Sequence, residues 1–219
     1  ILVGLVGSEM CIRDRPITAD RARQLRIPLM VRDNRSQHET NFTVSIDATH
    51  SVGPGVSARQ RAHTILEAVK AGATPSDISQ PGHIFPLVAK PGGVLQRAGH
   101  TEAGVDLARM AGCEPAAVIV EIMNEDGTMA RRPELEVFAK KHNLRIGTIA
   151  DLIEYRALHE QSVRCTGEFP IDTQWGKFTL TTFEDLVDGQ IQYALHQGEL
   201  TAADLPVRIQ PINTLRDVL

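Results

Sequence analysis

Cysteine and aromatic side chains are scarce in this chain of 219 residues. Aromatic residues make up 4% of the sequence. The three cysteines, Cys11, Cys113 and Cys165, lie far apart and form no C-x-x-C pair. Such spacing excludes both a disulfide framework and a zinc knuckle built from these residues. We therefore expect a protein of a reducing compartment, with a cytoplasmic location.

The sequence also lacks an excess of charge of one sign and lacks long apolar runs. Lysine and arginine total 23 against 27 aspartates and glutamates, so the formal net charge is −4. This balance gives no electrostatic footprint for nucleic acid or for an anionic membrane surface. No uninterrupted apolar run approaches the roughly 18 residues of a membrane-spanning helix. We expect neither nucleic acid nor a membrane as a partner, so an anionic ligand must be held by local groups.

The composition that remains is that of a globular protein. Hydrophobic residues make up 42% and charged residues 23% of the chain, which argues against disorder. At roughly 100–150 residues per domain, the length fits one full domain and part of a second.

The first fifteen residues stand apart from the rest. They contain no initiator methionine, and Arg13 and Arg15 follow the apolar stretch instead of preceding it, which argues against a signal peptide. The run resembles translated sequencing-adapter read-through. We therefore predict that residues 1–15 are a non-native leader, exclude them from fold reasoning, and expect the native N-terminus to be missing.

Alternating strand and helix patterns dominate residues 16–160. Residues 41–47 alternate apolar and polar side chains, which is typical of a half-buried strand. Ser57 and Gln60 fit a capping box at the start of a helix, and Gly72 is placed to end it. The other expected elements are helices at residues 18–25, 101–111, 133–142 and 148–159, and apolar strand-like runs at 83–89 and 116–122. This order predicts an α/β (α+β) domain, a layered mixed sheet flanked by helices.

The composition changes after residue 160. Residues 164–167 look like a linker, and residues 177–182 and 190–195 read as two strands, with 206–213 as a possible third. The segment has few large apolar side chains for its size. We predict that residues 166–219 are a partial, mostly-β domain.

The stretch Arg97–Ala103 (RAGHTEA) holds the strongest candidate for an anion site. A small residue, a glycine and a threonine precede a helix, so free backbone N–H groups at its positive end could bind a phosphate. Arg97 adds donors suited to the same anion, and the imidazole of His100 could bind a metal or move a proton. An ordinary helix N-terminus with a solvated arginine and histidine is the alternative.

Two further ionisable residues interrupt apolar runs. Glu121 follows Ala117–Val120 and must either face solvent or have its pKa raised by an apolar site, as a general base requires. His83 begins an apolar run after Pro81 and Gly82. It is either a hydrogen-bonded structural residue or a catalytic one. Only a fold that gathers strand ends could bring these residues and His100 into one site.

Taken together, four motifs resemble those of the 3,4-dihydroxy-2-butanone 4-phosphate synthase family. They are HIFPL at 83–87, PGGVL at 91–95, RAGHTEA at 97–103 and EIM at 121–123, and the resemblance runs from about Thr18 to His159. It implies a lyase of riboflavin biosynthesis that converts D-ribulose 5-phosphate to 3,4-dihydroxy-2-butanone 4-phosphate and formate. It also implies Mg²⁺ (or Mn²⁺) as cofactor and a homodimer with its sites at the subunit interface.

The resemblance further implies roles for individual residues. Arg97, Ala98, Gly99, His100 and Thr101 would hold the substrate phosphate, in agreement with the argument from the helix N-terminus. His100 would be a Mg²⁺ ligand. Glu121 would contact the substrate and, with His83, would handle protons. A divalent ion would stabilise the negative charge of an enediolate while a carboxylate takes a proton.

The chain departs from the family at its beginning. The acidic loop that supplies the family's other Mg²⁺ ligand is missing here, and residues 1–15 do not replace it. One protein ligand is too few to hold Mg²⁺ without substrate oxygens. We therefore expect this chain as written to have little or no synthase activity.

The last segment resembles the opening of a GTP cyclohydrolase II domain, on residues 169–178 and 206–211. That family holds zinc with three cysteines, whereas Cys165 is alone here, which indicates a degenerate or truncated remnant. Two alternatives remain open: a bifunctional enzyme that is also a GTP cyclohydrolase II, and a non-catalytic dimer partner.

Overall fold

The computed structural model describes residues 14–35, 40–50, 55–201 and 205–211. The chain divides into two compact units, Ile1–Ser162 and Val163–Leu219. Most of the expected leader lies outside the described residues, but Asp14 and Arg15 form the first half of a strand. Excluding all of residues 1–15 from the fold was therefore wrong for these two residues.

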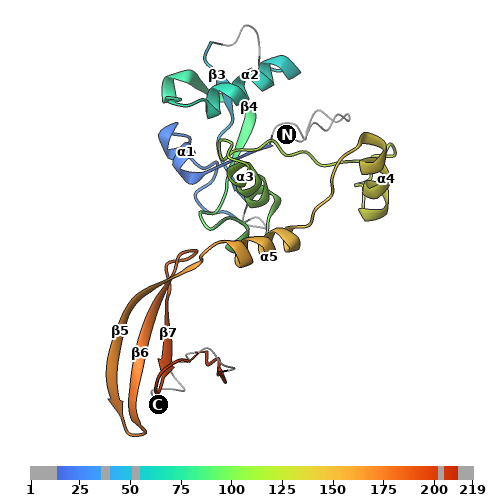
Figure 1. Ribbon diagram of the computed structural model, residues 1–219. Helices are drawn as coiled ribbons and strands as arrows, with labels where there is room; N and C mark the ends of the chain where they lie inside the picture. The colour runs from blue at the N-terminus through green and yellow to red at the C-terminus, as the bar shows by residue number, and fades with distance from the viewer. Residues whose placement is uncertain (1–13, 36–39, 51–54, 202–204, 212–219) are drawn as a thin grey trace. The chain divides into compact units, whose positions relative to one another are not determined.

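The first unit is built on a long central strand, β4 (Ile78–Val88). β1 (Asp14–Ile17) pairs with its second half in parallel, and β2 (Asn41–Phe42) pairs with its end antiparallel. β3 (Ile46–Ala48) pairs antiparallel with its first half. The result is a mixed sheet with β4 at its centre (Figure 1), which confirms the predicted fold class.

The five helices begin and end close to where their caps predict. Thr18, Ser57 and Thr148 each accept a hydrogen bond from a backbone N–H of the first turn, and Asn143 ends a helix in the left-handed conformation. None of the helices in the described part of the chain has both the length and the apolarity to cross a bilayer. The helices are α1 (Ala19–Gln24), α2 (Ala58–Val69), α3 (His100–Met110), α4 (Arg132–His142) and α5 (Ile149–His159), with short 3-10 turns at Pro75–Asp77 and Gly93–Leu95.

Two predicted strands differ in their bounds. The pattern at residues 41–47 forms two short strands instead of one, because between them Thr43 forms an isolated bridge with Leu29 and the backbone N–H of Val44 donates to the carbonyl oxygen of Pro28. The strand expected from residue 83 begins at Ile78, since β3 pairs with this earlier segment through Ala48.

The run 116–122 is not a regular strand, although it lies along β1. Ala116 forms a single antiparallel bridge with Ile17. The backbone N–H groups of Ala117 and Ile119 donate to the carbonyl oxygens of Pro16 and Asp14, at 3.0 and 3.3 Å. The segment thus extends the sheet beyond β1 without a continuous ladder.

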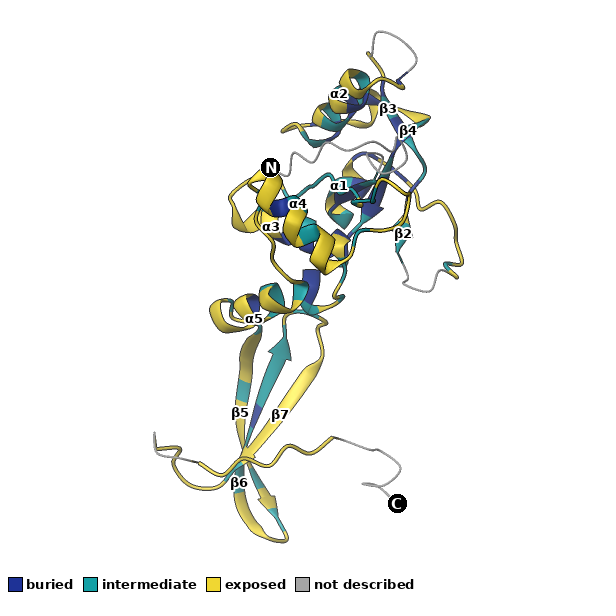
Figure 2. Ribbon diagram, turned by 90° about the vertical axis from the view of Figure 1, so that its right-hand side faces the viewer, coloured by how far each residue is buried: buried dark blue, intermediate teal, exposed yellow. Residues whose placement is uncertain are grey.

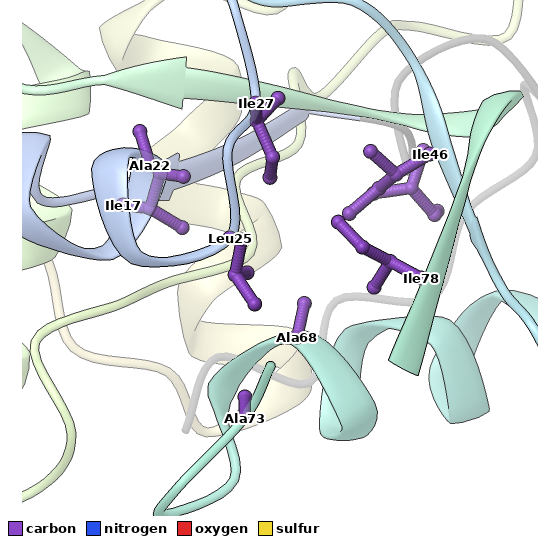
Figure 3. Close-up of a cluster of buried hydrophobic side chains, with 9 residues drawn as sticks. Ile17, Ala22, Leu25, Ile27, Ile46, Ala68, Ala73 and Ile78 are labelled. Carbon is purple, nitrogen blue, oxygen red and sulfur yellow. The ribbon is translucent and has the colours of Figure 1, made fainter. Parts of the chain in front are cut away.

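The core lies between the sheet, α1 and α2. Ile46 and Ile84 are fully buried on the two central strands, and Ile17 and Leu25 are nearly so. Figure 3 shows Ala68 of α2 directed toward Leu25 and Ile78. Small side chains on α2 thus let the helix approach the sheet closely.

The second unit is a three-stranded antiparallel sheet of β5 (Val163–Thr173), β6 (Gly176–Asp185) and β7 (Ile191–His196). The two predicted strands correspond to β6 and β7. The expected linker at 164–167 is part of β5, and residues 205–211 form no strand, whereas 212–213 lie outside the described residues. Figure 2 shows β5 and β7 as mostly exposed and β6 as mostly intermediate.

The strand β1 buries the charged side chain of Arg15, and part of its guanidinium makes no hydrogen bond to the described residues. Arg15 is 4% exposed, on the same face of β1 as the core residue Ile17. Its Nε and Nη1 atoms have no hydrogen-bond partner among the described residues. Burial, with a smaller contribution from Arg21, lowers the pKa of the Arg15 guanidinium to about 10. This position therefore suits an apolar side chain better than a cation.

We expect Arg15→Leu to stabilise the protein. The substitution removes two buried unpaired donor atoms and keeps apolar volume, so the free energy of unfolding should rise by about 1–3 kcal/mol, measured by urea denaturation. Arg23→Leu is the control, because Arg23 is 72% exposed and its replacement should change stability by less than about 0.5 kcal/mol. A loss of stability in Arg15→Leu would show that its guanidinium is compensated.

Candidate functional site

The stretch Arg97–Thr101 forms the N-terminus of α3, as predicted. Gly99 is the N-cap residue with an extended backbone, and no side chain caps the helix. A side chain at Gly99 would lie 2.3 Å from Nη1 of Arg97 and 2.6 Å from Oε2 of Glu102, so only glycine fits. His100 is exposed and Thr101 is buried. The first-turn N–H groups are thus available to an anion.

A buried glutamate holds Arg97 in place. Glu102 is 1% exposed, and its Oε2 accepts a hydrogen bond from Arg97 Nη1 at 2.5 Å. Its other oxygen accepts from the backbone N–H of Lys90 at 3.0 Å, and Arg97 Nη2 donates to Thr40 Oγ1 at 3.0 Å. Glu102 and Thr40, from two different segments, thus hold Arg97, which argues against the alternative of a solvated arginine.

Sequence reasoning gave Glu102 no role, although a signal was present. An acid in the first turn of a helix is ordinary, but here it stands five residues after an arginine at a glycine-led helix start. A carboxylate buried there needs a cationic partner. That requirement could have paired it with Arg97.

His83 lies on β4 and is held by Asp47. After Glu102, Asp47 is the second residue that sequence reasoning missed. Its ring Nδ1 lies 2.7 Å from Oδ2 of Asp47, and its backbone N–H donates to Oδ1 of the same carboxylate at 3.0 Å. The side chains of His83 and Asp47 are 39% and 16% exposed. His83 is thus both hydrogen-bonded and accessible to a ligand.

Glu121 is exposed, so it meets the first of its two expected conditions, a side chain facing solvent. It lies two residues beyond Ile119, whose N–H donates to Asp14. His83 lies two residues before Phe85, which pairs with Asp14 from the other side. Because β1 runs parallel to β4 and antiparallel to residues 116–119, both offsets point the same way along the sheet. The fold thus brings His83 and Glu121 toward one end.

Side-chain alternation also puts Glu121 and Asp14 on one face of the sheet. A side chain at Gly104 of α3 would contact Ala117, Ile119 and Pro16, so α3 covers the face that these three residues share. Residues two apart on an extended segment point to the same side. Glu121 therefore shares the face of Ile119, and Asp14 shares that of Pro16.

Asp14 adds a second carboxylate beside Glu121. Burial, together with the negative charge of Glu121, raises the pKa of the Asp14 carboxyl above its ordinary value of 3.8. The effect shows that the two carboxylates are within electrostatic reach.

The stretch Arg97–Thr101, the candidate anion site, lies beyond the C-terminal end of β4. Glu102 binds the backbone of Lys90, two residues past the end of β4. His83 precedes Lys90 by about 23 Å of extended chain, at about 3.3 Å per residue. The described residues of one chain thus form two half-sites: His83 with Glu121, and Arg97 to Thr101.

The residues present meet only part of the needs of a divalent metal. No group of three or more histidine, cysteine, aspartate or glutamate side chains gathers among the described residues. Mg²⁺ keeps several waters and commonly uses one or two protein ligands together with substrate oxygens. His100, exposed beside the phosphate-binding turn, fits the role of a single ligand of this kind.

Comparison with known proteins identifies the family. The sequence profile of 3,4-dihydroxy-2-butanone 4-phosphate synthase matches residues 9–155. The chain belongs to this family. The profile of GTP cyclohydrolase II matches residues 164–219. The match to the synthase profile spans both half-sites, and the second match supports the resemblance of the tail.

Relatives and solved structures agree with this assignment. The 3,4-dihydroxy-2-butanone 4-phosphate synthases of Pseudomonas aeruginosa and Photobacterium phosphoreum are 52% and 50% identical over 93% of this chain. The chain spans 56% of the length of either relative. The riboflavin biosynthesis protein RibBA of Aquifex aeolicus is 51% identical over 84% of this chain and 46% of its own length.

Two crystal structures share the fold. RibBX of A. baumannii, described as a two-domain synthase, is 50% identical with a TM-score of 0.83, over 94% of this chain and 60% of its own. A synthase in complex with two magnesium ions is 39% identical with a TM-score of 0.65, over 69% of this chain and 76% of its own. This complex shows that a member of the family binds a divalent metal.

We expect Asp14→Asn to stabilise the protein in a pH-dependent way. A carboxyl with a raised pKa in the folded state favours folding below pH 3.8, and this contribution is lost as the pH rises through the raised value. The melting temperature of Asp14→Asn should therefore exceed that of the unmodified protein at pH 7, and the gain should shrink toward pH 4. Asp33→Asn, 73% exposed, is the control. A gain that does not change with pH would contradict the assignment.

Proposed function

We propose that this chain carries the lyase part of a riboflavin biosynthesis enzyme. It would convert D-ribulose 5-phosphate to 3,4-dihydroxy-2-butanone 4-phosphate and formate. The observation that carries the proposal is the uncapped N-terminus of α3 beside Arg97, whose guanidinium is fixed by the buried carboxylate of Glu102. Backbone N–H groups and a preoriented guanidinium are the donors that a sugar phosphate requires.

The two half-sites suggest how the substrate would be handled. Arg97 to Thr101 would bind the phosphate and orient the sugar. Glu121, exposed beside a second carboxylate, would accept a proton during enolisation, and His83 would exchange protons through its ring. Mg²⁺ or Mn²⁺, when bound, would stabilise negative charge on substrate oxygens, and His100 would supply one ligand.

The separation of the half-sites supports a homodimer with shared sites. His83 lies near the middle of β4, whereas the turn at Arg97–Thr101 lies beyond the C-terminal end of β4, as the contact of Glu102 with Lys90 indicates. A second copy of the chain can place its own phosphate-binding turn near His83 and Glu121. Each complete site would then take residues from both subunits.

We do not extend the proposal to GTP cyclohydrolase activity. A catalytic zinc site uses three protein ligands and an open position. In residues 164–219, Cys165 and His196 are the only cysteine and histidine. The second unit therefore offers few of the usual ligands for this chemistry.

Ligand stabilisation and formate release test the proposed function. D-ribulose 5-phosphate with Mg²⁺ should raise the melting temperature by more than inorganic phosphate does, and formate should be released at a low rate, because His100 is the one Mg²⁺ ligand expected in this chain. Glu121→Gln is the matched variant, because it should keep the stabilisation while turnover falls about 100-fold or more. Equal stabilisation by phosphate and by the sugar phosphate, with no formate, would favour the non-catalytic dimer partner.

Mixed dimers test the shared site. His83→Gln and His100→Gln should each be inactive alone. Mixing the two variants under subunit exchange should restore about a quarter of the unmodified formate release, because half of the dimers are mixed and each has one intact site. Mixing a variant with itself is the control. No recovery in verified mixed dimers would place both half-sites in a single chain.

A further inference from the structure

The carboxylate of Asp47 contacts both the backbone and the ring of His83. Oδ1 accepts the backbone N–H of His83 at 3.0 Å, and Oδ2 lies 2.7 Å from the ring Nδ1. The hydrogen bond to Oδ1 helps to orient the carboxylate, and Oδ2 faces the ring. The ring of His83 is thereby held by a group from another strand.

The backbone around the pair is shaped to allow this contact. Ile46 pairs with Ile84, but the next residue, Asp47, pairs with Ser79. The intervening segment of β4 leaves the regular register, and the carboxylate of Asp47 nevertheless contacts both the backbone and the ring of His83. The N–H of Gly82 donates to Ser45 Oγ at 3.1 Å, which anchors the irregular segment to the neighbouring strand.

Two glycines lie so close to the pair that no side chain would fit. A Cβ on Gly82 would lie 2.1 Å from the carbonyl carbon of Ile46. A Cβ on Gly55 would lie 2.5 Å from Oδ2 of Asp47 and 2.8 Å from Nδ1 of His83, and Gly55 has a φ of +81°. The backbone of Gly55 thus covers the hydrogen bond from one side. The Nδ1 edge of the ring is enclosed, whereas 39% of the His83 side chain remains exposed.

We propose that Asp47 is a positioning residue that holds His83 as the Nδ1–H tautomer and leaves Nε2 free to act on substrate. A carboxylate can only accept, so a neutral ring facing it must donate from Nδ1 and present its lone pair at Nε2. The identity of the substrate rests on the proposed lyase function. The tautomer does not, because it follows from the contacts of Asp47 alone.

The assigned step is a proton transfer that balances within the cycle. Nε2 accepts the proton of a substrate hydroxyl, and the electrons of the O–H bond remain on the oxygen. The carboxylate of Asp47 stabilises the imidazolium formed. The same proton returns from Nε2 to substrate or product oxygen in a later step, so the residue pair is unchanged at the end.

The tautomer can be measured directly in the unmodified protein. With ¹⁵N-labelled histidine, His83 should show a protonated Nδ1 and an unprotonated Nε2 at a pH where the ring is neutral, with His83→Gln used to assign the signal. A protonated Nε2 in the unmodified protein would overturn the proposal, and this readout needs no substitution that affects folding.

Asp47→Asn is the decisive variant. The backbone N–H of His83 needs an acceptor, so the amide oxygen should occupy the place of Oδ1 and the NH₂ group should face Nδ1. His83 should then switch to the Nε2–H tautomer. With D-ribulose 5-phosphate, kcat for formate release should fall about 100-fold or more with little change in KM. Asp20→Asn, 87% exposed on α1, is the matched control and should change neither quantity.

The outcomes separate this role from the proposed function. A tautomer switch without formate release from any form would support the positioning role and contradict the lyase. Formate release with the same tautomer before and after Asp47→Asn would support the lyase and reduce Asp47 to a structural contact. Asp47→Glu gives a further check. It keeps a carboxylate on a longer side chain, so His83 should remain the Nδ1–H tautomer if the negative charge of residue 47, and not the shape of its side chain, decides the tautomer.

Discussion

The buried carboxylate of Glu102 is the interaction on which the candidate phosphate site depends. It accepts from Arg97 and from the backbone of Lys90, so it joins the turn before α3 to the segment that leaves β4. A fully buried charge is costly unless it is paired and hydrogen-bonded, and here both oxygens have partners. The guanidinium of Arg97 is thereby oriented before any ligand binds, which lowers the ordering cost of binding an anion.

The length of β4 decides how the candidate residues can combine. It carries His83 near its middle and leads, beyond its end, to the segment held by Glu102. On β3, which pairs irregularly with β4, Asp47 contacts His83, and residues 116–119 along β1 lead to Glu121 at the same end. The strand therefore separates the residues proposed for proton transfer from those proposed for phosphate binding within one chain, which is the basis of the proposed shared site.

The short strand β1 carries two electrostatic costs, one on each face. Arg15 lies on the core face with two unpaired nitrogen atoms, and Asp14 lies on the opposite face, where burial and Glu121 raise its pKa. Alternation along a strand forces adjacent residues to opposite sides, so two successive charged residues in a buried strand cannot both reach water. Both charged groups destabilise the fold locally, and the apolar packing around β1 offsets this loss of stability.

The sequence alone determined the helices, the mixed-sheet fold class and the candidate residues, because caps, glycines and apolar spacing are local signals. Ser57 and Gln60 form the expected capping box. Only the tertiary structure decided that Asp47 holds His83, that Glu102 holds Arg97, and that the half-sites lie apart. These facts depend on strand register and burial, and both arise from contacts between residues distant in the chain, which no local pattern records.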